Sequence, residues 1–472
     1  MFLVRYLCFF IKNVFFILEK KKVLCYNVRC DVLYGFFPRR LLMVFAITVA
    51  AITCIAMIAA VLFFPTLKIK RFSVATYWIV TSLGALVLLF SGVVDVNEIG
   101  AAIVADSAIN PLKILVLFIS MTVLSIFLDE LGFFKYLASC ALRRAGSSQT
   151  KLFIMLFATV SILTVFTSND IIILSFTPFV CYFAKNAKIN PLPYLTAEFV
   201  AANTWSMALI IGNPTNIYLL TAAGGDFVSY LKVMLLPTLA AGSIACLMLF
   251  LLFRKKLSEP INASYEDVEI KDKLLLRIGI AHLAVCTVIL AVGSYIGIEM
   301  WLVSLISVIS LFLCNTVISI VRREKPYALL GCLKRAPWDL IPFVLSMFVI
   351  VESLSMTGVT GEIFGLLGSS NSVWKYGTAS FFASNLINNI PMSVLFSSIL
   401  ESAPSNMDAV YATVVGSNLG ACFTPIGALA GIMWSSILRE HGLKFGYLDF
   451  LKTGICVAIP ALVAALGVIA VL

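Results

Sequence analysis

Two short stretches, VFTSNDI at residues 165–171 and FASNLINNIP at residues 382–391, decide the fold of this chain. They lie inside the apolar segments 151–185 and 376–400 and split each of them with polar residues. Two short helices that meet at a polar tip form a re-entrant hairpin, which a membrane tolerates only where protein or a water-filled cavity surrounds it. We therefore expect two hairpins that enter the bilayer without crossing it.

The composition around these segments predicts a membrane protein made of helices. Of the 472 residues, 61% are hydrophobic and 12% are charged, and apolar runs recur from end to end. The runs are long enough for helices to cross the hydrocarbon core, and they lack the alternation that a β-barrel needs. We expect an all-α polytopic protein with spans at residues 41–63, 75–93, 112–128, 192–220, 226–252, 275–296, 301–321, 338–354, 409–438 and 447–472.

Charged residues in the loops set the expected orientation. Lys and Arg gather in the cytoplasmic loops of membrane proteins, so the formal net charge of +10 does not indicate nucleic-acid binding. Arg143 and Arg144 precede segment 151–185 and Lys188 follows it, so both ends face the cytoplasm only if the segment is a hairpin. Lys375, at the base of the second hairpin, is the one clear exception to the charge pattern.

Few residues suit metal binding or catalysis. The twelve Cys are scattered without a C-x-x-C pair, which is typical of reduced thiols used as small apolar residues. The two His, His282 and His441, do not make a His-rich site, so we expect no metal and no other cofactor. The chain has no nucleophile-and-base set and no H-E-x-x-H motif, and a receptor or scaffold has no need of paired hairpins. These observations favour transport over catalysis.

The sequence pattern indicates that the chain consists of two related halves. Aligning them pairs Pro111 with Pro337, Ser120 with Ser346, Gly132 with Gly358, Ser168-Asn169 with Ser384-Asn385, Asn203 with Asn418 and Gly212 with Gly427. We expect a first transport repeat at 41–253, a cytoplasmic connector at 254–273 and a second repeat at 274–472. Each repeat holds five spans and one hairpin, and an odd number of spans inverts the second copy.

Each repeat also contains a span that Gly and Pro interrupt. Residues 192–220 are interrupted at Gly212-Asn213-Pro214-Thr215-Asn216, and residues 409–438 are interrupted between Gly420 and Gly427. Broken helices free backbone groups that a cation or a polar solute can bind, although a kink stabilised by neighbouring helices is the alternative. The expected substrate or ion site comprises Ser168, Asn169, Asp170, Asn203, Gly212, Asn213, Thr215, Asn216, Ser384, Asn385, Asn388, Asn389, Asn418, Thr424 and Gly427.

With these motifs in place, the chain resembles the ion transporter superfamily. Its segments Leu128-Asp129-Glu130-Leu131-Gly132, Ser168-Asn169-Asp170, Asn388-Asn389-Ile390-Pro391 and Thr424-Pro425-Ile426-Gly427 are similar to those of the arsenical pump membrane protein family. The break at Gly212 to Asn216 instead looks like that of the sodium/proton antiporter and citrate/dicarboxylate carrier branches. This departure does not change the expected fold, but it leaves the substrate undecided between these branches of the superfamily.

The resemblance implies a multi-pass secondary active transporter of the plasma membrane, that is, the cell inner membrane. The implied activity is export of arsenite and antimonite, with H⁺ as the coupling ion. The alternative is a sodium/proton antiporter or a carrier that couples citrate or dicarboxylates to Na⁺. The implied partners are a small inorganic or organic solute and the lipid bilayer, with a second copy of the chain and a soluble pump ATPase as further candidates.

Four carboxyl groups are candidates for carrying the coupling proton, namely Asp170, Glu198, Glu130 and Glu352. A carboxyl group that is buried without a cation can carry a proton at neutral pH. Asp170 is favoured because it is the only acid at either hairpin tip and its repeat partner is the apolar Leu386. For Glu130, as for the preceding Asp129, a solvated helix end is the alternative.

Residues 1–40 fit neither repeat. Their apolar part is interrupted by Arg5 and Lys12, and three consecutive lysines follow at 20–22. A signal peptide, a weak extra span or an upstream extension of the reading frame would each look like this. The extension is favoured because Met43 opens a much cleaner first span.

Overall fold

The computed structural model describes residues 39–64, 66–69, 72–105, 110–259, 269–293, 298–401 and 406–472. The expectation for residues 1–40 therefore lies almost entirely outside the described residues, as does the middle of the connector. Eight helical stretches in the described part, among them Gln149–Phe166 of the first expected hairpin, are long and apolar enough to cross a membrane, which confirms the polytopic α-helical class. One small addition is an antiparallel ribbon of β1 (Thr66–Ile69) and β2 (Phe72–Ala75) in the first loop.

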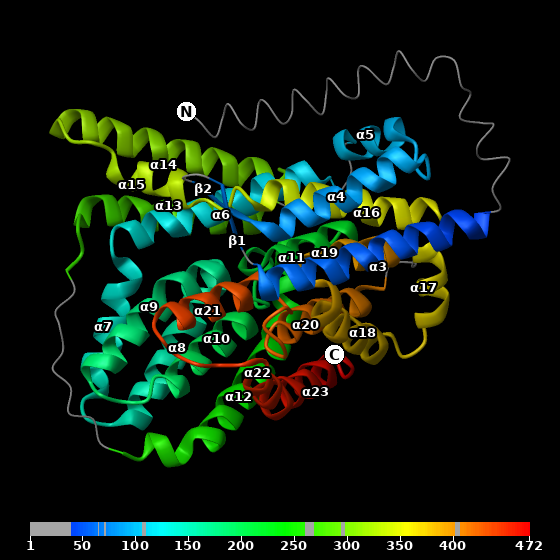
Figure 1. Ribbon diagram of the computed structural model, residues 1–472. Helices are drawn as coiled ribbons and strands as arrows, with labels where there is room; N and C mark the ends of the chain where they lie inside the picture. Colours follow the sequence, from blue (N-terminus) through cyan, green and yellow to red (C-terminus); the bar gives the residue numbers. More distant parts are fainter. Residues whose placement is uncertain are drawn as a thin grey trace.

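The helices form two layers (Figure 1). In the first layer α3 packs on α4, α4 packs on α16, and α6 packs on α14. It consists of α3 (Arg39–Phe63), α4 (Thr76–Ser91), α6 (Pro111–Glu130), α13 (Lys273–Gly293), α14 (Met300–Arg322) and α16 (Leu340–Met356). In the most apolar window of α6 78% of residues are buried, against 17% for α3, so α6 is central and α3 faces lipid.

The second layer contains both hairpins and both broken helices. Here α8 packs on α10, α10 on α12, α18 on α20, and α12 on α23. The first half contributes α8 (Gln149–Phe166), α9 (Asn169–Asn186), α10 (Leu192–Trp205), α11 (Pro214–Ala222) and α12 (Phe227–Leu257). The second half contributes α18 (Ser372–Ile387), α19 (Asn389–Glu401), α20 (Met407–Gly420), α21 (Leu429–Glu440), α22 (Tyr447–Thr453) and α23 (Ile459–Ile469).

Short helices link these elements. Two of them, α5 (Val96–Val104) and α15 (Tyr327–Arg335), precede α6 and α16. The other two, α7 (Phe133–Ala145) and α17 (Val359–Leu367), lead from α6 and α16 into the hairpins. Both α7 and α17 begin after a glycine in the left-handed region, with φ of 84° at Gly132 and 91° at Gly358. Other residues rarely adopt this conformation, so the matched glycines have the same backbone role in each half.

Two boundaries differ from the sequence-based expectation. The first broken helix is interrupted at residues 206–213, earlier than expected, and Pro214, Thr215 and Asn216 begin the helix that follows. The helix α12 continues to Leu257, so the start of the expected connector is helical. The second break, between α20 and α21, lies where Gly420 and Gly427 indicated.

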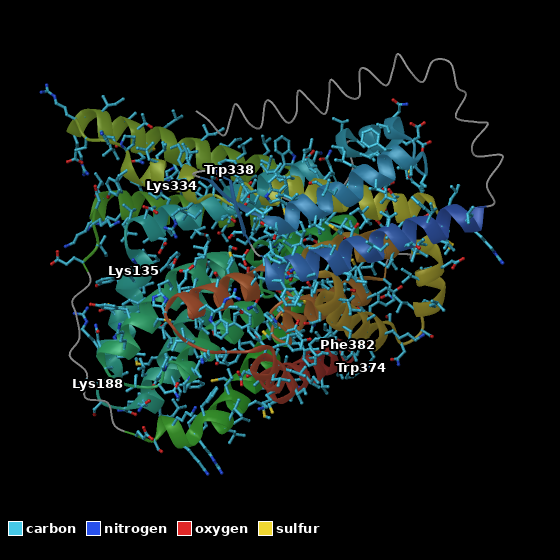
Figure 2. All side chains as sticks on the ribbon, viewed as in Figure 1. Lys135, Lys188, Lys334, Trp338, Trp374 and Phe382 are labelled. Carbon is cyan, nitrogen blue, oxygen red and sulfur yellow. The ribbon has the colours of Figure 1, made fainter. Side chains whose placement is uncertain are left out.

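Three lysines mark one end of the molecule. Figure 2 shows Lys135, Lys188 and Lys334 toward the left of the view, on α7, just after α9 and on α15. The charge pattern assigns this end to the cytoplasm. The exceptional Lys375 donates hydrogen bonds from Nζ to the Leu367 carbonyl (2.9 Å) and to Ser370 Oγ (3.4 Å). Its charge is therefore used at the C-terminal end of α17, where a cation is favourable.

Candidate functional site

The first hairpin meets the first broken helix through two asparagines. The tip lies between α8 and α9, and Ser168 and Asn169 are both buried there. Asn169 donates from Nδ2 to Asn203 Oδ1 on α10 (3.1 Å), and Asn203 donates in turn to the Phe199 carbonyl (2.8 Å). The hairpin motif and the broken-helix motif of the first half are thus in direct contact.

The second hairpin is held to the break between α20 and α21. At its tip Asn388 takes a left-handed φ of 73° and donates from Nδ2 to the Ile426 carbonyl (2.9 Å). Asn385 donates to the Gly420 carbonyl (3.1 Å) and accepts a hydrogen bond from Thr424 Oγ1 (2.6 Å). These bonds satisfy backbone carbonyls that the interrupted helix leaves without helical partners.

Backbone contacts complete this second junction. Asn389 N–H donates to the Gly427 carbonyl (3.0 Å). A Cβ at Gly427 would lie 2.6 Å from the Gly420 carbonyl oxygen and 2.9 Å from Asn385 Oδ1. Only glycine permits this approach of tip and break. Ser384, the neighbour of Asn385, is turned into its own helix and donates to the Ser380 carbonyl (2.7 Å).

Asn418 joins the two halves at the centre. Its Oδ1 accepts hydrogen bonds from Ser206 Oγ and Asn213 Nδ2, both 2.9 Å away in the first break. Its Nδ2 donates to Asn216 Oδ1 (2.7 Å) and to the Val414 carbonyl (2.8 Å). Both donors and both acceptor positions of this fully buried amide are used. Asn418 therefore holds the two breaks together and has no hydrogen-bonding capacity left for a ligand.

Asn216 is equally occupied. Its Nδ2 donates to the Ser206 (2.8 Å) and Leu209 (3.1 Å) carbonyls, which lie in the interrupted segment. Thr215 N–H is capped by Asn213 Oδ1 (3.2 Å). A Cβ at Gly212 would lie 2.3 Å from the Ser206 carbonyl oxygen, so glycine is required here too. This part of the expected site builds the broken helix.

Unused hydrogen-bonding groups remain at the first hairpin tip and on both broken helices. Ser168 Oγ and Asn169 Oδ1 at the tip, Thr204 Oγ1 on α10 and Ser417 Oγ on α20 are buried and have no partner among the described residues. Buried polar atoms are normally paired. These neutral hydroxyl and amide groups can therefore bind a small polar solute without competing against an existing bond.

Asp170 is placed differently from its neighbours at the tip. It lies in the first turn of α9, is partly exposed, and makes no hydrogen bond or ion pair within the described residues. Its charge acts on Tyr77 of α4, in the opposite layer. An acid in a first helical turn also interacts favourably with the helix dipole. The tip thus carries one accessible carboxyl group at the boundary between the layers.

Glu198 lies away from the hairpin tip, inside the second layer. It is fully buried, and its Oε1 accepts a hydrogen bond from Thr177 Oγ1 on α9 (2.8 Å). Its Oε2 has no hydrogen-bond partner in the part of the chain that the structure describes, although the indole N–H of Trp434 on α21 lies close to the carboxyl group. A buried carboxylate without a cation is costly, so Glu198 fits a protonated side chain.

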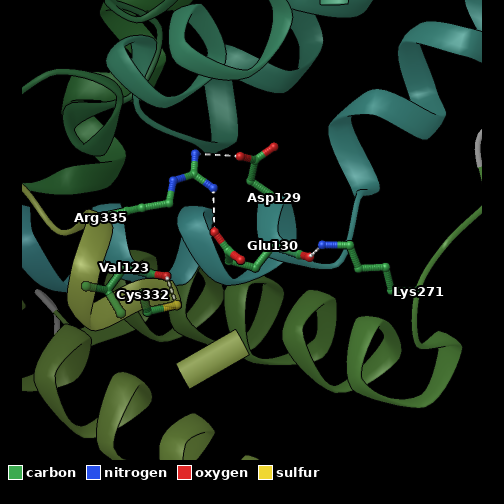
Figure 3. A network of polar contacts seen from close by, with 6 residues as sticks. All are labelled: Val123, Asp129, Glu130, Lys271, Cys332 and Arg335. Atoms are coloured by element: carbon green, nitrogen blue, oxygen red, sulfur yellow. Dashed lines mark hydrogen bonds and ion pairs between the residues drawn. The ribbon is translucent and has the colours of Figure 1, made fainter. Parts of the chain in front are cut away.

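Asp129 and Glu130 are paired with a base, as Figure 3 shows. Arg335 at the end of α15 contacts Asp129 Oδ2 from Nη2 (2.6 Å) and Glu130 Oε1 from Nη1 (2.7 Å). Lys271 adds a hydrogen bond from Nζ to the Glu130 carbonyl (2.8 Å). The two acids therefore form a junction between the halves, apart from both hairpin tips.

Sequence reasoning missed Ser206, Thr204 and Ser417, although each lies next to a residue that it selected or in the break itself. Their signal was weak, because small hydroxyl residues occur throughout membrane helices and bond back to the preceding turn.

In the described residues no group of three or more His, Cys, Asp or Glu side chains is placed to hold a metal ion.

Comparison with known proteins identifies a family and several relatives with similar sequences. Residues 42–414 match the family model of the citrate transporters. The arsenical pump membrane protein of Escherichia coli is 27% identical over 405 residues, which cover 82% of this chain and 92% of that protein. The putative arsenical pump membrane protein of Bacillus subtilis (strain 168) is 26% identical over 410 residues, covering 79% and 89%.

A solved structure has the same fold. The YdaH transporter of Alcanivorax borkumensis superposes with a TM-score of 0.54, covering 91% of this chain and 98% of that chain. The two sequences are 12% identical, so the likeness concerns the fold alone.

Proposed function

We propose that this chain, which belongs to the citrate transporter family, exports arsenite and antimonite as a proton-coupled secondary active transporter. It is a multi-pass transporter of the cell membrane and not an enzyme.

The neutral lining of the first hairpin tip carries the substrate proposal. Undissociated arsenous acid is a small uncharged polyol, which needs hydroxyl and amide partners. Ser168 Oγ and Asn169 Oδ1 are such groups, and both are buried and have no hydrogen-bond partner among the described residues. The curated relatives named arsenical pump membrane proteins support the same choice.

The distribution of charge argues in the same direction. In both hairpins and both broken helices, Lys and Arg occur only near the far ends, at Lys151, Lys185, Lys375 and Arg439. A di- or tricarboxylate at the tips would have to rely on helix N-termini or on a bound cation. A neutral solute has no such requirement.

We assign the coupling proton to Asp170. It is the one acid at either tip, it is partly exposed, and no base neutralises it among the described residues. Loading a proton on one side of the membrane and releasing it on the other would link substrate export to the proton gradient.

A second candidate is sodium/proton antiport or sodium-coupled citrate or dicarboxylate transport. The match to the citrate transporter family model favours it, as does the Gly212-Asn213-Pro214-Thr215-Asn216 segment. In this reading the side-chain oxygens of the tips would bind Na⁺.

Expression in a bacterial host that lacks its own arsenite exporter distinguishes these functions. We expect raised arsenite tolerance, together with arsenite accumulation in inverted vesicles that collapses when the proton gradient is dissipated. The double variant Ser168→Ala/Asn169→Ala should lose the effect, and Glu362→Gln, an exposed carboxyl on α17, should keep it. Unchanged arsenite tolerance with a gain in sodium tolerance, or with sodium-dependent citrate uptake, would transfer the assignment to the second candidate.

A further inference from the structure

A small cavity lies away from both hairpin tips, where α11 and α19 of the second layer meet α16 of the first. Figure 1 shows these helices side by side in the middle of the molecule. Polar groups in its wall come from Tyr218, Glu352, Ser397 and Ser398, and the remaining wall is apolar. There is room for roughly one water-sized occupant.

Glu352 is the only acid in the described wall, and it has no basic partner. It makes no hydrogen bond or ion pair within the described part of the chain. The charged groups that act on it are Glu401 at the end of α19 and Glu98 on α5, both acidic. The described residues of α3, α4, α6 and α17 supply no opposing charge to it. A half-enclosed carboxylate among other acids requires a cation or a proton.

The hydroxyl of Tyr218 is an independent indication of a ligand. The side chain is 1% exposed, lines the cavity, and its hydroxyl has no hydrogen-bond partner among the described residues. Buried tyrosine hydroxyls are usually paired. Here the unpaired oxygen and the unpaired carboxyl line the same small space.

We propose that Glu352 and Tyr218 form a small-cation site, for H⁺ or Na⁺, between the two layers of the transporter. The wall offers only oxygen atoms as ligands, which suit a hard cation. A single carboxylate favours a monovalent ion, and a divalent ion would need more acidic ligands than the described residues gather. This site deepens the proposed cation coupling and is separate from the tip residues Ser168, Asn169 and Asp170.

The position of the site between the layers makes it sensitive to their arrangement. Glu352 belongs to α16 in the first layer, whereas Tyr218 and Ser397 belong to α11 and α19 in the second. A cation that binds both sides stabilises the arrangement in which they meet. By linkage, the affinity for the cation is higher in this arrangement than in one that separates the two layers.

The test measures binding, without substrate, on the full chain in lipid nanodiscs. Radioactive sodium binding and the infrared carbonyl band of protonated carboxyl groups, followed across pH, report Na⁺ and H⁺ respectively. We expect the wild type to show either sodium binding or a titrating carbonyl band that belongs to Glu352, and we expect Glu352→Gln to lose that sodium binding or that one band while the bands of other carboxyl groups remain. Tyr218→Phe, which removes one oxygen from the wall, should weaken a sodium signal about fivefold or shift the titrating carbonyl band.

Glu362→Gln is the matched control, since Glu362 is an exposed acid on α17 outside the cavity. It should leave the binding signal unchanged. If Glu352→Gln does not fold, Tyr218→Phe alone decides, and wild-type signals in that variant overturn the proposal. Identical sodium and carbonyl signals in wild type and Glu352→Gln also overturn it. Because no substrate is present, this result is independent of whether arsenite is the solute.

Discussion

Asn418 and Ser417 are neighbours on α20 with opposite hydrogen-bonding environments. The amide of Asn418 is fully bonded, to Ser206, Asn213 and Asn216 of the other half and to its own helix. The hydroxyl of Ser417 is just as buried and has no partner among the described residues. At the residue scale, one of the two side chains holds the protein together and its neighbour does not.

Asn418→Ala should therefore destabilise the protein strongly. Truncation leaves Asn213 Nδ2 without its bond to this side chain and removes the 2.7 Å bond to Asn216 Oδ1, whereas the Ser206 hydroxyl can still donate to the Asn203 carbonyl. Each buried group left unpaired costs about 1–3 kcal/mol. We expect a clear fall in the thermal unfolding midpoint of the purified transporter. Ser417→Ala removes a hydroxyl that makes no bond and should stay close to wild type. Equal loss in both variants would contradict the assigned role of Asn418.

Asp170→Asn should separate coupling from binding. The substitution keeps the shape of the hairpin tip and removes the proton site, so arsenite accumulation against its gradient should stop in inverted vesicles. Passive exchange of arsenite should continue at least in part, because Ser168 and Asn169 are unchanged. Asp170→Glu should retain some uphill transport. Near-normal uphill transport by Asp170→Asn would show that the carboxyl is structural and would pass the role to Glu198.

At the element scale, the junction of α6, α7 and α15 depends on Arg335. This guanidinium contacts both Asp129 and Glu130 just before Gly132, where the chain turns left-handed into α7. Asp129 is buried, and its Oδ1 has no partner among the described residues. Arg335→Met would leave two adjacent carboxylates without a base. Because Asp129 is buried while Arg335 is 34% exposed, the loss should be smaller than for a fully buried pair but larger than for a surface pair. Thermal unfolding should detect it.

A triple variant provides the control for this junction. Arg335→Met combined with Asp129→Asn and Glu130→Gln removes the unpaired charges together with the base. Its unfolding midpoint should lie above that of Arg335→Met alone, since neutral groups cost less to bury than charges. A triple variant less stable than the single one would mean that packing of the arginine stem, and not charge pairing, stabilises the junction.

The hairpins can be tested by labelling. In a cysteine-free background, single cysteines at Lys151 and Asn186, both exposed at the base of α8 and α9, should react with an impermeant reagent from the same side of the membrane. Cysteines at Arg144 and Arg254 are controls for the cytoplasmic side. Labelling of positions 151 and 186 from opposite sides would mean that this segment crosses the bilayer.

At the scale of the whole molecule, the described fold and the family match both begin close to residue 40. The first helix starts at Arg39, and the family model matches from residue 42. Deletion of residues 2–38, which joins Met1 to Arg39, should preserve membrane insertion and arsenite tolerance. Deletion through residue 63 should abolish both, because α3 packs against α4 and α16. Loss of folded protein in the shorter deletion would show that the N-terminal segment is needed.

Much of this architecture could be predicted because polar residues inside apolar runs must be surrounded by protein or water when they lie within a membrane. Both hairpins and the break at Gly420 to Gly427 follow from that rule. The break at Ser206 was misplaced because residues 206–211 contain neither Gly nor Pro. The carbonyls of Ser206 and Leu209 are bonded instead by the side chain of Asn216, a contact that no local pattern reveals. The order of elements is the same in both halves, while the inversion of the second repeat stays a prediction.

The contacts of Arg335 and Tyr218 could not be predicted for a related reason. Arg335 meets Asp129 from 206 residues away in the sequence, and its place next to Lys334 in a basic loop looks like ordinary cytoplasmic charge. Tyr218 is one of many aromatic residues in apolar helices. Only the packing of α11 against α19, and of α19 against α16, brings its hydroxyl to the same cavity as Glu352.

The bonds at the second hairpin tip also impose an order on biosynthesis. Asn385, Asn388 and Asn389 bond to carbonyls of Gly420, Ile426 and Gly427, all of which leave the ribosome later than the hairpin itself. Until those residues are made, the polar tip lacks these three partners, and hydrocarbon offers no substitute. The nascent α18–α19 segment must therefore wait at the membrane surface or beside earlier helices, and it can reach its final depth only after α20 and α21 have followed it into the bilayer.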